Sequence, residues 1–184
     1  MSVDLKTAYG LSGKTALVTG GGSGLGLAIA KCLSAAGARI IIAGRREPIL
    51  SQACQDIGQE TAYEVIDLAD VKGVRQAADK MVDTHGPIDI LINNAGNTIK
   101  KPFQESSIED FDQVFDVHVR GALELTRRLV GDQISCGEGS VIFTSSMTAY
   151  IGQPNVLGYT VAKTALSGVI RGLAAELSSQ GVRE

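Results

Sequence analysis

The sequence predicts an α/β fold in which a parallel sheet carries helices on both faces. Short runs rich in Val, Ile, Leu and Ala alternate with longer segments whose apolar residues recur every three or four positions. The short runs are apolar throughout, as expected of strands buried on both faces. Glycines stand where the runs give way to the periodic segments. Repeated strand–helix–strand units with right-handed crossovers then produce a doubly wound sheet.

Each expected element has its own signal. The expected strands are the apolar runs at 14–19, 38–43, 61–66, 88–92 and 140–144. The expected helices are the periodic segments at 24–36, 46–57, 70–85, 107–132 and 159–179. Their ends carry helix start and stop residues, namely Gly37, Pro48, Asp70, the Gly86–Pro87 pair and Ser107. The strand order becomes 3-2-1-4-5, which places a ligand crevice between strands 1 and 4.

Composition narrows the class of protein. The 184 residues suffice for one domain, taken as 1–184 with a polar lead-in at 1–12, and 44% of them are hydrophobic and 20% charged. A net charge of -3 without a basic cluster argues against nucleic-acid binding. No apolar run reaches the ~18–20 residues of a membrane span. Three scattered cysteines fit neither a metal motif nor a disulfide framework. We expect a soluble, cytoplasmic protein with no metal site.

A glycine-rich turn follows the first strand. Glycine lets the backbone turn tightly, and the next helix offers free N–H groups and a positive dipole end to a pyrophosphate. The spacing is G-x-x-x-G-x-G and not a complete G-x-G-x-x-G, so an ordinary turn is the alternative. Its position between a strand and a helix favours dinucleotide binding. The residues expected to bind are Gly20, Gly22, Ser23, Gly24, Leu25 and Gly26.

Two arginines at the end of the second strand predict the type of dinucleotide. A carboxylate that accepts a bond from a ribose 2′-hydroxyl usually stands there. This chain has Arg45 and Arg46 instead, and its first carboxylate, Glu47, comes later. Guanidinium groups suit a 2′-phosphate, so NADP is the expected cofactor and NAD remains possible. Solvated loop arginines are the alternative.

Tyr159 and Lys163 are the candidates for acid–base chemistry. Four residues apart on a helix, they share one face. A lysine cation beside a tyrosine lowers the pKa of the phenol and would let it exchange a proton near pH 7. The spacing alone occurs by chance on many helices.

From Leu11 almost to its last residue, the chain resembles the short-chain dehydrogenase/reductases, which have a Rossmann-like fold. Four motifs in order carry the resemblance: the turn at 19–26, Asn93-Asn94-Ala95-Gly96, a serine after the fifth strand, and Tyr159-x-x-x-Lys163. It implies hydride transfer between a nicotinamide and a carbonyl or secondary alcohol.

The resemblance also implies roles for matching residues. Ser146 would hold the substrate oxygen, with Ser145 less favoured, and Tyr159 would be the acid/base. Lys163 would bind the nicotinamide ribose and lower the pKa of Tyr159. The remaining cofactor contacts would be Asp67 and Leu68 near the adenine, and Asn94, Ala95 and Gly96 along the cleft.

The chain departs from the family pattern in two places. His118 replaces the usual asparagine, and it could support the structure, join a proton relay with a titration near pH 6.5, or simply be buried. The chain also ends at Glu184, where the resemblance implies roughly 60–70 further residues containing two more strands and a substrate lid. Strand 5 is then expected at the sheet edge.

The substrate remains open between two classes. The stretch 97–103 and the Gly152-x-Pro154 loop resemble the gluconate and polyol dehydrogenases, and Lys100 or Lys101 could meet a sugar-acid carboxylate. A reductase of 3-oxoacyl groups on carrier protein is the alternative, and a non-catalytic truncated cofactor binder or assembly subunit is a third. The family resemblance further implies a homodimer or homotetramer built on the helices at 107–132 and 159–179.

Overall fold

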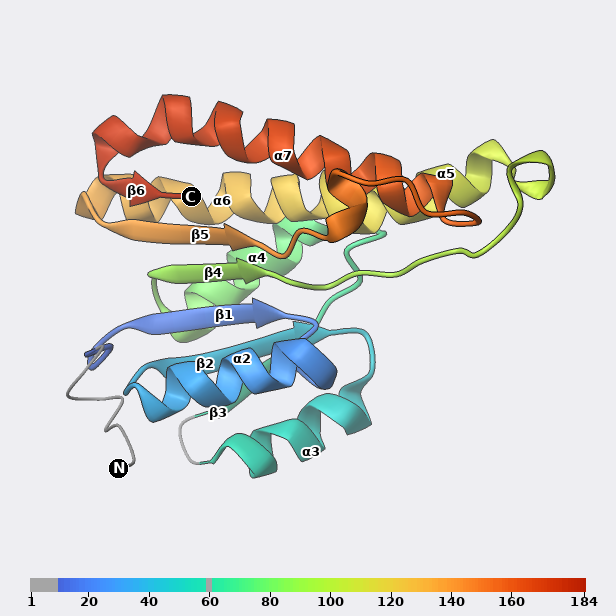
Figure 1. Cartoon of the computed structure of the whole chain (residues 1–184). Coiled ribbons are helices and arrows are strands. Elements are labelled where there is room, and N and C mark those ends of the chain that lie inside the picture. Colours follow the sequence, from blue (N-terminus) through green and yellow to red (C-terminus); the bar gives the residue numbers. More distant parts are fainter. Residues whose placement is uncertain (1–9, 59–60) are drawn as a thin grey trace, which may run out of the picture.

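The sheet is parallel and six-stranded, with the order β3-β2-β1-β4-β5-β6 (Figure 1). The structure is a computed structural model that describes residues 10–58 and 61–184, so most of the lead-in expected at 1–12 lies outside the described residues. The strands are β1 (Thr15–Thr19), β2 (Arg39–Gly44), β3 (Thr61–Val65), β4 (Ile90–Asn93), β5 (Gly139–Phe143) and β6 (Val182–Arg183).

Helices cover both faces of this sheet, as the sequence predicts. The main helices are α2 (Gly24–Ala35), α3 (Glu47–Ile57), α4 (Val71–His85), α5 (Ile108–Phe115), α6 (Gly121–Cys136) and α7 (Leu157–Leu177). Figure 1 shows α2 and α3 on one face and α4, α6 and α7 on the other. Neighbouring residues of β1 therefore serve different cores: Leu17 packs toward α4 and α6, whereas Ala16 and Val18 pack toward α2. This explains why the strands are apolar at every position.

The helix ends carry the predicted chemistry. Gly37 has a φ of 102° directly after the end of α2, a conformation that glycine adopts without strain. Asp70 caps α4 by accepting a hydrogen bond from the backbone N–H of Gly73. Ser107 and Asp110 form a reciprocal capping box at the start of α5. These local signals therefore fix where the long helices begin and end.

The helix predicted at 107–132 is present, but it contains a π-helical turn that the sequence did not predict. A turn of π-helix at Asp116–Arg120 separates α5 from α6, and α6 continues to Cys136. Gly121 follows the turn and lies so close to the backbone of Leu68 that an added Cβ would be 2.1 Å from the Leu68 carbonyl oxygen. The helix thus approaches the loop after β3 at van der Waals distance, and the wide turn brings residues 117–119 into the core.

The expectation that strand 5 forms the sheet edge was wrong. Gly181 has a φ of 83° and reverses the chain, so that β6 pairs with the first two residues of β5. An added Cβ at Gly181 would be 2.0 Å from the Gly137 carbonyl oxygen, so only glycine allows this close approach. Within the part of the chain that the structure describes, no helix has both the length and the hydrophobicity needed to cross a bilayer.

Candidate active site

A cavity of about 760 Å³ opens where β1, β2, β4 and β5 end, which is the crevice that the strand order predicts. Its volume lies within the range of small-molecule sites. Most of the predicted site residues line it, namely Gly20, Gly22, Ser23, Leu25, Gly26, Arg45, Arg46, Asp67, Leu68, Asn94, Ala95, Gly96, His118, Tyr159 and Lys163. Gly24 and Ser146 are not on its wall.

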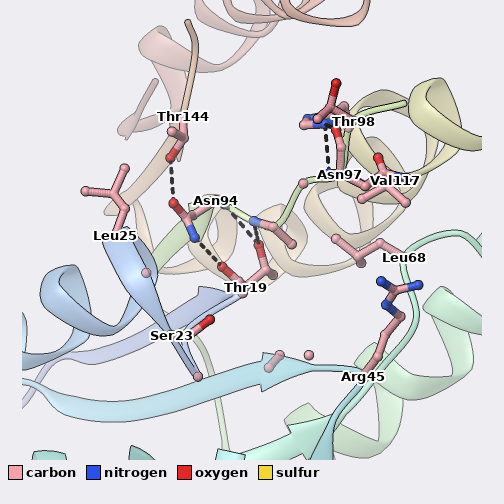
Figure 2. Close-up of a pocket in the computed structure, with 18 of the residues that line it drawn as sticks. Thr19, Ser23, Leu25, Arg45, Leu68, Asn94, Asn97, Thr98, Val117 and Thr144 are labelled. Atoms are coloured by element: carbon pink, nitrogen blue, oxygen red, sulfur yellow. Dashed lines mark hydrogen bonds between the residues drawn. The ribbon is translucent and has the colours of Figure 1, made fainter. Parts of the chain in front are cut away.

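Hydrogen bonds join the ends of three strands at the floor of the cavity (Figure 2). The buried Thr19 hydroxyl at the end of β1 accepts from the N–H groups of Asn94 and Ala95, both at 3.0 Å, and donates to the Ile92 carbonyl at 3.2 Å. The Asn94 amide donates to the Thr19 carbonyl at 3.0 Å and accepts from the Thr144 hydroxyl after β5 at 3.3 Å. The crevice is therefore cross-linked before any ligand enters.

The glycine turn is shaped so that a ligand can approach the backbone. Gly20 and Gly24 have φ values of 67° and 53°, in the region that favours glycine. A Cβ added at Gly26 would be 2.3 Å from the Gly20 carbonyl oxygen and 2.6 Å from Nδ2 of Asn94. Ser23 precedes the first turn of α2 and its hydroxyl makes no capping bond to the helix. The helix N–H groups and this hydroxyl thus face the cavity side as donors for phosphate oxygens.

The far end of the cavity, beyond β2, is positively charged. Arg45 extends from the end of β2 toward Leu68 in Figure 2, and its guanidinium is 4.0 Å from the Asp67 carboxylate. Both side chains are largely exposed, so this ion pair is weak. Arg46 lines the same end. Among the described residues, Asp67 is the one acidic side chain on the wall, against Arg45, Arg46, Lys100 and Lys163.

Tyr159 and Lys163 meet on the cavity wall as the helix spacing predicts. Lys163 is only 3% exposed, and its ammonium donates to the Thr144 carbonyl at 2.5 Å. The same nitrogen lies 5.5 Å from the centre of the Tyr159 ring. Burial lowers the pKa of Lys163 to about 8. The lysine is therefore held between the end of β5 and the tyrosine.

Ser146 lies three residues after the end of β5, and its hydroxyl bonds to neighbouring residues. It accepts from the backbone N–H of Thr148 at 3.2 Å and from the Thr148 hydroxyl at 3.0 Å, capping a short 3-10 helix at Met147–Ala149. Ser145 is more exposed than Ser146. The contacts that the structure gives Ser146 are those of a cap. They use both lone pairs of the hydroxyl and leave its proton available to another partner.

His118 lies in the π-turn, 3% exposed, with its ring edge-on to Tyr159 at a centroid distance of 5.3 Å. Its Nε2 is 2.8 Å from the carbonyl oxygen and 3.1 Å from the nitrogen of Asn97. Burial lowers the pKa of His118 to about 4; the Asn97 bond opposes the shift and the charge of Lys163 adds to it. The titration near pH 6.5 that the sequence allowed is therefore not favoured by this environment.

Sequence reasoning missed several residues of the cavity. Thr19 and Thr144 organise the floor, and their only signal was a hydroxyl residue at the end of an expected strand. Asn97, Thr98, Gln153 and Val156 line the end near Tyr159. No group of three or more metal-binding side chains is found within residues 10–58 and 61–184.

Comparison with known proteins places the chain in a family. The family model described as short chain dehydrogenase matches residues 14–183. Short chain aldehyde dehydrogenase 1 of Euphorbia lathyris is 32% identical over 181 residues, which cover 96% of this chain and 63% of that relative. The chain thus spans less than two thirds of the length of that relative.

Solved structures agree in fold over the same region. A gluconate 5-dehydrogenase from Burkholderia cenocepacia in complex with NADP and tartrate is 31% identical with a TM-score of 0.86, covering 94% of this chain and 69% of that one. A 3-ketoacyl-(acyl-carrier-protein) reductase from Brucella melitensis complexed with NADH is 30% identical with a TM-score of 0.87, covering 94% and 74%. On these matches, this chain belongs to the short chain dehydrogenase family.

Proposed function

We propose that the chain, as one dinucleotide-binding domain, carries the cofactor site and acid–base centre of an oxidoreductase. The enzyme would transfer a hydride between NADP(H) and a carbonyl or secondary alcohol. The observation that carries the proposal is the buried Lys163 beside Tyr159, in the same cavity as the glycine turn. The nicotinamide supplies the hydride chemistry when bound. The protein supplies position, electrostatics and a proton.

The cavity fits a dinucleotide on its own features. A side chain at Gly26 would fill the space against Gly20, and the donors at the start of α2 suit a pyrophosphate. The cofactor contacts would come from the residues that the family motifs match: Gly20, Gly22, Ser23, Gly24, Leu25, Gly26, Arg45, Arg46, Asp67, Leu68, Asn94, Ala95, Gly96, Tyr159 and Lys163.

In the proposed proton transfer, Tyr159 gives its phenolic proton to the substrate oxygen as charge develops there. Ser146 donates a hydrogen bond to the same oxygen, and its hydroxyl can do so while it accepts the two bonds from Thr148. The Lys163 ammonium lies 5.5 Å from the centre of the tyrosine ring, so it places a positive charge beside the group that gives up the proton. Oxidation of an alcohol uses the same groups in reverse.

The proton role is tested by Tyr159→Phe in the full-length protein. The variant should bind cofactor as wild type does and lose nearly all turnover, because the phenyl ring keeps the packing and removes the proton. Turnover close to wild type would refute the role of Tyr159.

NADP preference rests on Arg45 and Arg46. The 2′-phosphate would bring a charge that two exposed guanidinium groups can pair, and Arg45 would exchange its long contact with Asp67 for a closer one. Relatives bind either cofactor, NADP in the Burkholderia enzyme and NADH in the Brucella enzyme. Cofactor fluorescence titrations should give tighter binding of NADPH than NADH, with the difference reduced in Arg45→Ala. Tighter binding of NADH would contradict the assignment.

A carboxylate-bearing substrate, such as a sugar acid, is favoured by Lys100. Lys101 is already engaged, since its ammonium contacts both oxygens of Asp110 at 2.9 and 2.7 Å. Its backbone N–H also donates to the Asn155 carbonyl at 2.9 Å. Lys100 lines the cavity, and no ion pair joins it to an acid among the described residues. The tartrate in the Burkholderia complex is a dicarboxylate. These observations favour a sugar acid over the alternative, a 3-oxoacyl group on carrier protein.

The substrate class is tested by comparing kcat/KM for gluconate and for an uncharged polyol of equal length. Lys100→Gln should lower the preference for gluconate roughly tenfold, as expected for one charged hydrogen bond. Lys101→Gln is the matched control and should leave the preference unchanged. Preference for a 3-oxoacyl thioester in the wild type would select the alternative enzyme. Turnover of no substrate in the full-length protein, with cofactor still bound, would select a non-catalytic role.

Light scattering tests the expected homodimer or homotetramer.

A further inference from the structure

His118 connects the loop after β4 with helix α7 on the cavity wall. Its imidazole joins the backbone of Asn97, in the loop between β4 and α5, to the ring of Tyr159 on α7. Its Nδ1 is buried without a hydrogen-bond partner among the described residues. A charged ring would bury an unpaired N–H beside the Lys163 ammonium, so the environment selects the neutral form.

The bond to Asn97 does not depend on which neutral tautomer forms. If Nε2 carries the proton, it donates to the Asn97 carbonyl at 2.8 Å. If Nε2 is unprotonated, it accepts from the Asn97 N–H at 3.1 Å. Either tautomer bonds to Asn97, and the one with the proton on Nε2 is favoured because it leaves no unpaired N–H at the buried Nδ1. The ring is thus held against this loop, whose side chains Asn97 and Thr98 line the cavity.

Gly96 provides the space that the ring occupies. A Cβ added there would lie 2.3, 3.0 and 3.2 Å from Cε1, Nε2 and Nδ1 of His118, which are its three nearest neighbours. Gly96 does not have a positive φ, so its backbone tolerates a side chain. The buried, bonded imidazole is therefore what excludes one.

From these contacts we propose that His118 is a positioning residue, a neutral spacer that sets the distance between the Asn97 loop and the Tyr159 ring. The expected loss of turnover rests on the proposed function. The expected position of the Tyr159 ring rests on the contacts alone. The positioning role differs from a proton relay because no proton passes through the imidazole. A misplaced acid/base costs turnover while cofactor contacts elsewhere remain.

Two variants separate the two contacts. His118→Phe keeps a ring edge for Tyr159 and removes the bond to Asn97. His118→Gln keeps a polar group for Asn97 and removes the ring. In both, kcat should fall roughly 10- to 100-fold, as for a misplaced catalytic group, while the cofactor Kd and the substrate KM stay within about twofold. A change in the substrate KM or the cofactor Kd alone, with kcat unchanged, would overturn the proposal.

A readout without turnover keeps this test separate from the proposed function. The chain has four tyrosines, so tyrosine labelled with ¹³C at the ε positions gives four ring signals in a carbon–proton spectrum, and Tyr159→Phe assigns the relevant one. In the cofactor-free protein, this signal should move in both His118 variants by more than the other three. His85→Gln, which changes the only other histidine, is the control and should leave it in place. An unmoved Tyr159 signal would overturn the proposal even if the wild type has no activity.

The Gly96 contact supplies an independent check. Gly96→Ala should displace the imidazole and shift the Tyr159 signal, and adding His118→Ala should restore folding stability relative to Gly96→Ala alone. Additive effects of the two changes would show that the ring does not fill this space and would count against the proposal. If both His118→Phe and His118→Gln fail to fold, the residue serves the fold and the positioning role is refuted.

Discussion

Replacing Gly26 by alanine tests whether the glycine turn is built around a close backbone approach. The new Cβ would lie 2.3 Å from the Gly20 carbonyl oxygen and 2.6 Å from Nδ2 of Asn94. The first contact is about 0.7 Å inside the 3.0 Å below which such contacts are essentially never seen, so the turn or α2 must move. Neither neighbour is a flexible side-chain end, because Asn94 is bonded to Thr19 and Thr144.

The size of the effect follows from these contacts. Overpacking costs about 1–3 kcal/mol, and losing the bond between Asn94 and Thr19 adds about 1 kcal/mol. The free energy of unfolding should therefore fall by about 2–4 kcal/mol, which lowers Tm by roughly 4–16 °C for a chain of this size. Since the displaced backbone is the surface offered to the pyrophosphate, cofactor affinity should fall at least tenfold.

Thermal unfolding and NADPH fluorescence titration measure the two effects. Gly131→Ala is the matched control, because Gly131 is also helical and has open space around it. That variant should be neutral or more stable by about 0.5–1 kcal/mol, since alanine has the better helix propensity. Wild-type Tm and affinity in Gly26→Ala would refute the close-approach argument.

Three further changes test other parts of the structure. Thr19→Val keeps the shape of a buried residue but removes the acceptor of the Asn94 and Ala95 N–H groups. Urea unfolding should show that the free energy of unfolding falls by about 2–4 kcal/mol. A fall below about 0.5 kcal/mol would contradict the hydrogen-bond network. Ser107→Ala removes the capping box of α5 and should cost about 1 kcal/mol in the same assay, whereas Ser106→Ala, one residue before the cap, should cost less. For His118, the pKa falls from 6.5 in the unfolded chain to about 4 in the fold, so the unfolded chain binds more protons between these values. The free energy of unfolding is therefore highest above pH 6.5 and falls by up to about 3 kcal/mol as the pH is lowered toward 4. His118→Gln should flatten this part of the curve of stability against pH. Identical slopes in the wild type and the variant would show that His118 does not contribute.

The order of elements could be predicted because each carried a local signal. Buried strands read as apolar runs, and Gly37, Asp70 and Ser107 stand at helix ends with the expected geometry. The crevice then followed from strand order alone, and the glycine turn, the arginines and the Tyr159–Lys163 pair were all placed on its wall.

What the sequence did not reveal depends on contacts between distant segments. The π-turn lies in a stretch with ordinary helical residues, and its partner, the Leu68 carbonyl against Gly121, is some fifty residues earlier in the chain. Two residues of β6 are too few for a strand pattern, and Gly181 read only as a helix end. The depressed pKa of His118 required its burial and its distance from Lys163. Thr19 and Thr144 could not be told from other strand-end threonines without the register that brings them to Asn94.

The cross-link at the floor of the crevice has a consequence for slow backbone motion. Asn94 and Ala95 lie in the connection after β4 rather than in a strand, yet their N–H groups end on a buried hydroxyl of β1. Amide hydrogens of connecting segments usually exchange with solvent through small local openings. These two can exchange only after they lose their bonds to the Thr19 side chain, so we expect them to be better protected than other amides of the connection. A cofactor would then bind against a connecting segment that is held in place by a strand of the sheet.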